Sequence, residues 1–191
     1  MESLDATELL HLGLQATQHD DSAKAIEYLK QCLALDPENA QATYLLGALY
    51  AQIGLYDRAK TALARAIVLN ASESTAVFQL GLLHVTSGDV DQADEVWRHL
   101  DTLPADHAFN LFRHGLLALT RDDFAECESL LERGIGANSF NEALNNDMRR
   151  LKESAAAARE KTVPGQVVTA SPEVSPTARH LLGGYGKQNR H

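Results

Sequence analysis

The 191 residues include 45% hydrophobic and 23% charged side chains, a composition that fits one folded domain with an appendage. The formal charge of −9 at pH 7 argues against a nucleic-acid partner, because binding to a phosphate backbone depends on clustered Lys and Arg. The first residues lack the positive leader of a secretory signal, and no later segment reaches the roughly 18 consecutive apolar residues of a membrane helix, so we expect a cytoplasmic protein without a membrane partner.

A period of 34 residues runs through most of the sequence. Four glycines and four small residues recur at this interval, namely Gly13, Gly47, Gly81 and Gly115, and Ala25, Ala59, Ala93 and Cys127. A fixed period in this range is typical of stacked helical repeats, in which each unit buries its apolar face against its neighbours. We therefore expect four repeats, at about 6–39, 40–73, 74–107 and 108–141.

Each repeat is predicted to be a pair of helices. In residues 40–73 the apolar side chains recur at intervals of three and four, which is a helical spacing, and Gly54 separates the two runs. The repeated glycine lies inside the first helix, where it costs about 1 kcal/mol relative to alanine. We attribute it to a close approach of the second helix, and we attribute the small residue twelve positions later to the same contact.

After the repeats the sequence changes character twice. Residues 142–161 are predicted to form a capping helix, because Leu144, Met148 and Leu151 lie on one stripe beside polar side chains. Residues 162–191 are rich in proline and glycine and are predicted to be a disordered tail. Within this tail one apolar group is either a docking motif for a partner or plain linker, and it consists of Leu181, Leu182 and Tyr185.

The repeats resemble the tetratricopeptide repeat. Its consensus places hold Leu12, Gly13, Ala16, Ala25 and Pro37 in the first repeat, Leu46, Gly47, Tyr50, Ala59, Leu63 and Ala66 in the second, Leu80, Gly81, His84, Ala93 and Trp97 in the third, and Gly115, Ala118, Cys127 and Leu131 in the fourth. The fourth repeat departs from the pattern, with His114 in place of leucine and Gly134 in place of alanine. The resemblance covers about residues 6–141 and implies an all-α solenoid of four helix-turn-helix repeats, followed by the capping helix and the tail.

The resemblance also implies a binding groove lined by the first helices. The family's ligand-facing positions, carried onto this chain, are Leu10, His11, Leu14, Gln41, Tyr44, Leu45, Ala48, Phe78, Gln79, Leu82, Val85, Phe109, Phe112, Arg113, Leu116 and Leu119. Most are apolar, so we expect a groove for an extended or helical apolar segment of a protein partner. The same residues are alternatively core, or are covered by a second copy of the chain or by its own tail.

Two known uses of this fold differ in groove chemistry. Family members that grip acidic peptides carry Lys and Asn at places that here hold Leu10, Leu14, Phe78 and Leu82, so we expect no carboxylate clamp. The apolar lining is more similar to that of bacterial secretion chaperones with tandem tetratricopeptide repeats.

No catalytic constellation is visible in the sequence. The eight histidines have no metal-ligand spacing with cysteine or carboxylate, and Cys32 and Cys127 occupy small repeat positions. We therefore expect no catalytic residue, no metal site and no cofactor.

The leading hypothesis is a non-enzymatic adaptor or scaffold that binds an apolar partner segment and assists the assembly or escort of a multiprotein complex, as a chaperone does. One alternative is a subunit that self-associates through the groove as a homo-oligomer. Another is an accessory or regulatory subunit of an enzyme or secretion complex, with the tail as docking motif or autoinhibitory plug.

Overall fold

The computed structural model describes residues 4–161 and 176–188, with the backbone alone for 183–188. The regular elements in these ranges are all helical, and none of these helices is long and apolar enough to span a bilayer. The described residues divide into two compact units, which meet in the sequence between Leu80 and Gly81.

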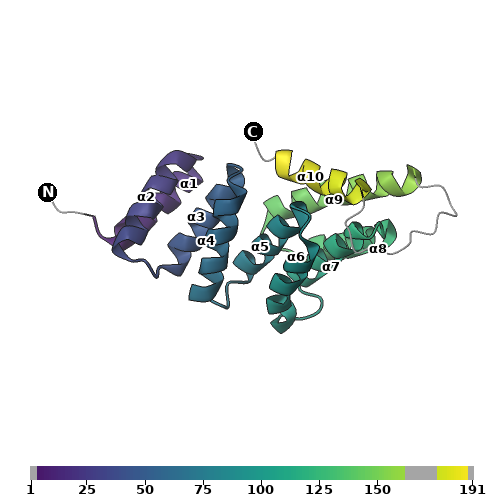
Figure 1. Cartoon of the computed structure of the whole chain (residues 1–191), viewed down its shortest axis with the longest axis horizontal. Helices are drawn as coiled ribbons and strands as arrows, with labels where there is room; N and C mark the ends of the chain where they lie inside the picture. The colour runs from purple at the N-terminus through teal and green to yellow at the C-terminus, as the bar shows by residue number, and fades with distance from the viewer. Residues whose placement is uncertain (1–3, 162–175, 189–191) are drawn as a thin grey trace. The chain divides into compact units, whose positions relative to one another are not determined.

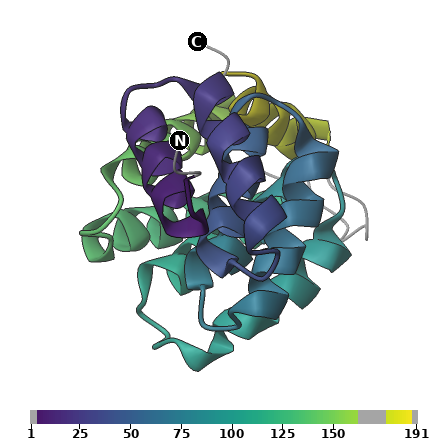
Figure 2. The same ribbon diagram turned by 90° about the vertical axis from the view of Figure 1, so that its left-hand side faces the viewer.

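Unit 1 consists of helix pairs. It contains α1 (Ala6–Gln18), α2 (Ser22–Leu35), α3 (Ala40–Gln52), α4 (Tyr56–Leu69) and the first half of α5 (Ser74–Thr86). Helix α1 packs on α2 and α3 packs on α4, while α2 also contacts α3. In Figure 1 and Figure 2 the helices of this unit are coloured from purple to blue.

Unit 2 contains the rest of α5 and the remaining helices. These are α6 (Val90–Trp97), the 3-10 helix η1 (Arg98–Thr102), α7 (Ala108–Thr120), α8 (Phe124–Ala137), α9 (Glu142–Lys161) and α10 (Pro176–Gln188). Helix α7 packs on α8, α8 packs on α9, and α10 lies on α9 and also contacts α7 (Figure 1).

The 34-residue period is reproduced in the helix boundaries. The first helices of the four repeats begin at Ala6, Ala40, Ser74 and Ala108, and the second helices begin at Ser22, Tyr56, Val90 and Phe124. The prediction of an all-helical fold of repeated helix pairs is therefore confirmed.

The repeated glycines lie where the two helices of a repeat approach each other. A Cβ added to Gly13 would lie 2.9 Å from Leu29, one added to Gly47 would lie 2.9 Å from Leu63, and one added to Gly115 would lie 3.0 Å from Leu131. In the third repeat Gly81 meets the indole of Trp97 in the same way. A side chain at these glycines would force the helices apart, which is the physical reason for the pattern.

The turn within each repeat has one residue in the left-handed region. These residues are Asp20 (φ 57°), Gly54 (φ 79°), Gly88 (φ 90°) and Asp122 (φ 57°), again 34 positions apart. Aspartate is one of the few residues other than glycine that tolerates this conformation, because its short carboxylate bonds locally to the backbone.

Part of the segment that we expected to be disordered is a helix. Helix α10 contains Gly183, Gly184 and Gly186, each of which weakens a helix by about 1 kcal/mol relative to alanine. Its side chains Ala178 and Leu182, four positions apart, are 0% and 2% exposed, so tertiary contact stabilises the helix despite its composition. The rest of 162–191 lies outside the described residues.

Candidate functional site

The predicted groove residues fall into two sets. Along α1 and α3 the apolar members are half-buried, and these are Leu10, Leu14, Tyr44, Leu45 and Ala48. His11 and Gln41 are exposed, while Gln79 and Leu82 on α5 are half-buried. The second set is buried and consists of Phe78, Val85, Phe109, Phe112, Arg113, Leu116 and Leu119. For this second set, the expectation of an open groove does not hold.

The burial of α7 explains most of this difference. Eleven of its thirteen residues are buried, and it contacts α6, η1, α8 and α10. The ring of Phe112 lies over Gly134 of α8, where an added Cβ would come within 2.5 Å of it. Glutamate at Phe78 or Phe112 would therefore place a carboxylate in the core, and such a variant would report on folding rather than on binding.

Arg113 has a structural contact in place of the predicted polar contact with a ligand. Its guanidinium donates hydrogen bonds to the backbone carbonyl of Trp97 and to the carboxylate of Asp101. The Trp97 carbonyl lies at the end of α6, where the chain changes to the 3-10 helix η1. The hydrogen bond from Arg113 holds the pKa of Asp101 below its usual value, so the pair is ionised at neutral pH.

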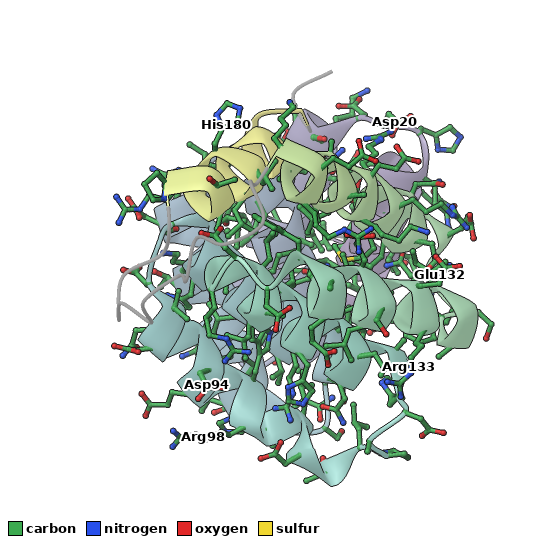
Figure 3. All side chains as sticks on the ribbon, turned by 90° about the vertical axis from the view of Figure 1, so that its right-hand side faces the viewer. Asp20, Asp94, Arg98, Glu132, Arg133 and His180 are labelled. Carbon is green, nitrogen blue, oxygen red and sulfur yellow. The ribbon has the colours of Figure 1, made fainter. Side chains whose placement is uncertain are left out.

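The predicted tail motif is partly packed against the chain itself. Leu182 is buried and Leu181 is half-buried on α10, whereas the side chain of Tyr185 lies outside those described. The neighbouring His180 is exposed and points away from the helix (Figure 3). In the described structure, α9 and α7 are thus the docking surface of this helix.

A hollow of roughly 310 Å³ lies in unit 1, beside the half-buried set. Helix α3 contributes Ala40, Gln41, Tyr44 and Leu45 to its lining. The remaining lining residues are Ala66 of α4, Asn70 directly after α4, and Glu73 directly before α5. Three of these residues, Gln41, Tyr44 and Leu45, belong to the predicted groove. Of the other four, Ala40 is the first residue of α3. Ala66, Asn70 and Glu73 come from the second helix and the inter-repeat turn, which an analysis restricted to first helices does not include.

Tyr44 joins the apolar and polar parts of this hollow. Its hydroxyl accepts a long hydrogen bond of 3.5 Å from Nε2 of Gln79. Burial raises the pKa of Tyr44 above its ordinary value, and the nearby Glu73 carboxylate raises it further. The hydroxyl is therefore neutral at physiological pH, and it presents a polar edge above an apolar ring.

The described residues contain no cluster of side chains that could bind a metal ion. No group of three or more His, Cys, Asp or Glu side chains comes together in residues 4–161 or in the described part of α10. Burial raises the pKa of the Cys127 thiol to about 12, which leaves it protonated and unreactive at neutral pH.

Comparison with known proteins agrees with this architecture. The tetratricopeptide repeat family matches residues 16–80, from the end of α1 into α5. Residues 16–80 are therefore similar to the tetratricopeptide repeat. No curated protein matches the sequence.

Two solved structures are similar to this chain in fold. A mutant O-GlcNAc transferase of Thermobaculum terrenum is 27% identical, with a TM-score of 0.57 over 70% of this chain and 27% of that one. A MamA protein is 21% identical, with a TM-score of 0.59 over 87% of this chain and 98% of that one, and it shows the fold alone. The present chain thus spans just over a quarter of the transferase.

Proposed function

We propose that the chain is a protein-binding adaptor that holds an apolar segment of a partner protein on the surface of its first two repeats. Tetratricopeptide repeats are a protein-interaction fold, and the hollow beside Tyr44 is the observation that supports this location. Pockets for small ligands run to about 300–1,000 Å³, so this hollow accommodates one or two side chains rather than a folded body. Leu10, Leu14 and Ala48 add half-buried apolar surface along α1 and α3.

A selection from a phage-displayed library of random twelve-residue peptides tests the proposal. The full chain should enrich peptides with an apolar anchor residue. Ala40→Leu, which fills the hollow from its wall, should lose this enrichment. Ala64→Leu makes the same change at an exposed position of α4 and should retain it. Equal enrichment by the two variants, with both folded by circular dichroism, would place the binding surface elsewhere.

The alternative of an accessory subunit with an autoinhibitory tail gains support from α10. This helix buries Leu182 and contacts α7, whose predicted groove residues are covered. A partner helix that carries a small residue and a leucine at the same spacing as α10 would then compete with α10 for binding to α7. Leu182→Glu should add a second class of enriched peptides in the same selection, whereas His180→Glu, on the exposed side of α10, should not.

Self-association remains the third possibility for the apolar surface. A monomeric mass by light scattering across a hundredfold dilution supports the adaptor proposal. A mass that rises with concentration in the parent chain but not in Ala40→Leu would assign the hollow to a second copy.

A further inference from the structure

The hollow in unit 1 is lined by apolar surface, by two amide side chains and by one carboxylate. Ala40, Leu45, Ala66 and the ring of Tyr44 supply apolar surface, and the polar lining comes from Gln41, Asn70 and Glu73. Of these seven residues, Glu73 alone carries a charge. An occupant with an apolar side chain therefore brings its neighbouring residue close to a carboxylate.

Glu73 has no cation paired with it among residues 4–161. Other carboxylates of the chain are paired, such as Asp101 with Arg113, Glu142 with Arg149 and Glu132 with Lys152.

The basic residue nearest in sequence on the lining helix is already engaged. Arg65 of α4, next to Ala66, donates a hydrogen bond of 3.0 Å to the backbone carbonyl of Pro37 in the preceding inter-repeat turn. The guanidinium of Arg65 is thus directed to the backbone and does not pair with Glu73. The Glu73 carboxylate can therefore pair with a cation of an incoming segment.

The charge of the whole unit has the same sign as Glu73. Residues 1–80 carry ten acidic and five basic side chains, a formal charge of −5. A negative surface attracts cationic segments and repels anionic ones during encounter, and like charges brought together at an interface oppose binding. An acidic partner segment is therefore disfavoured here.

We propose that the occupant of this hollow is a partner segment in which an apolar side chain enters beside Tyr44 while an adjacent lysine or arginine pairs with Glu73. This inference rests on the proposed function, because it names the chemistry of the partner for the same surface. Asn70 and Gln41 also line the hollow, and their amide groups can bond to the backbone of the segment.

The test compares residue preferences next to the apolar anchor in peptides selected by the parent chain, by Glu73→Gln and by Glu73→Lys. Glu38→Gln is the matched control, because it removes the same charge from an exposed residue of the previous inter-repeat turn. Dissociation constants are then measured for an enriched peptide and for its counterparts with Gln or Glu in place of the cation.

The parent chain and Glu38→Gln should bind the cationic peptide about twofold to fivefold more tightly than the Gln peptide, the range expected for a solvent-accessible ion pair. Glu73→Gln should abolish this preference, and Glu73→Lys should reverse it toward the acidic peptide.

The two proposals fail in different ways. Apolar anchors without any cationic preference in the parent chain, or a preference that survives in Glu73→Gln, would overturn the pairing with Glu73 and leave the adaptor proposal intact. An absence of apolar anchors in the parent selection would overturn both proposals. A hollow occupied by a second copy, as shown by light scattering, would replace the partner segment with the chain itself.

Discussion

Gly134 occupies a place where the family pattern has alanine, and the ring of Phe112 accounts for the difference. An added Cβ would lie 2.5 Å from two atoms of that ring and 3.3 Å from Leu111. The large residue on α7 and the missing side chain on α8 thus fit together. A departure that looks like a weak point in the sequence is a specific contact in the folded repeat.

Replacing Gly134 with alanine should lower the free energy of unfolding by about 1–3 kcal/mol, because the added carbon overpacks the contact with Phe112. Gly136 lies in the same helix, and an added Cβ there meets nothing within 4 Å. Gly136→Ala should therefore stabilise the chain by up to about 1 kcal/mol. Urea unfolding followed by circular dichroism measures both values, and a stabilising Gly134→Ala would contradict the described packing.

The buried thiol of Cys127 makes stability depend on alkaline pH. Burial raises its folded pKa to about 12, with Glu128 and Asp123 adding to the shift, while an exposed thiol has an ordinary value of 9.0. Below pH 9 both states carry the proton and this group contributes no pH dependence. Above pH 9 the unfolded thiol ionises first, so the unfolded state binds fewer protons and stability falls as pH rises.

Cys127→Ala should reduce this alkaline loss, since the other three repeats already carry alanine at that place as Ala25, Ala59 and Ala93. The term being removed is at most about 1.4 kcal/mol per pH unit above pH 9. Urea unfolding at pH 8, 9 and 10 in the presence of a reductant gives the slopes. If the free energy of unfolding fell equally steeply with pH in the parent chain and in the variant, the thiol would have the same pKa in the folded and unfolded states.

At the scale of elements, α10 is the helix that is hardest to predict from its own sequence. Its three glycines and flanking prolines indicate a chain without stable structure, and the stripe of Ala178 and Leu182 is too short to be distinguished from chance. The helix depends on α9 and α7 for its stability. Single-sequence patterns do not contain that information, because it arises from contact with residues far away in the chain.

Leu182→Glu should release α10 from these helices. Burial of a leucine side chain contributes about 1.5–3 kcal/mol, so amide hydrogen exchange across 176–188 should accelerate by roughly tenfold to a hundredfold. His180→Glu changes an exposed residue of the same helix and should leave the exchange rates within about twofold of the parent. Mass spectrometry of the exchanged chain measures both. Unchanged protection in Leu182→Glu would show that Leu182 does not anchor the helix.

At the scale of the molecule, the period of 34 residues predicts the boundaries of the repeated helices, because every repeat must solve the same packing problem. The same period does not predict which residues form the candidate site. Whether Leu116 or Leu14 is accessible depends on what covers each first helix, and α7 is enclosed while α1 and α3 are partly open. The lining of the hollow also includes Asn70 and Glu73, whose roles arise only when α4 and the following turn are placed beside α3.

The net charge of −9 should affect the association rate constant of a cationic peptide more than its dissociation rate constant. For a peptide with a cation beside its apolar anchor, stopped-flow measurement should show an association rate constant that falls steadily between 20 and 300 mM NaCl, because salt screens long-range attraction. The dissociation rate constant should change less. The uncharged counterpart with Gln serves as the control. An equal salt dependence for the two peptides would exclude electrostatic steering.

The position of Trp97 provides a ready optical probe. It is the single tryptophan of the chain, it is completely buried, and its indole fills the space above Gly81. Its emission should therefore be blue-shifted and protected from iodide quenching in the native protein. Any loosening between α5 and α6 would admit the quencher, so the third repeat carries its own fluorescent reporter without any labelling.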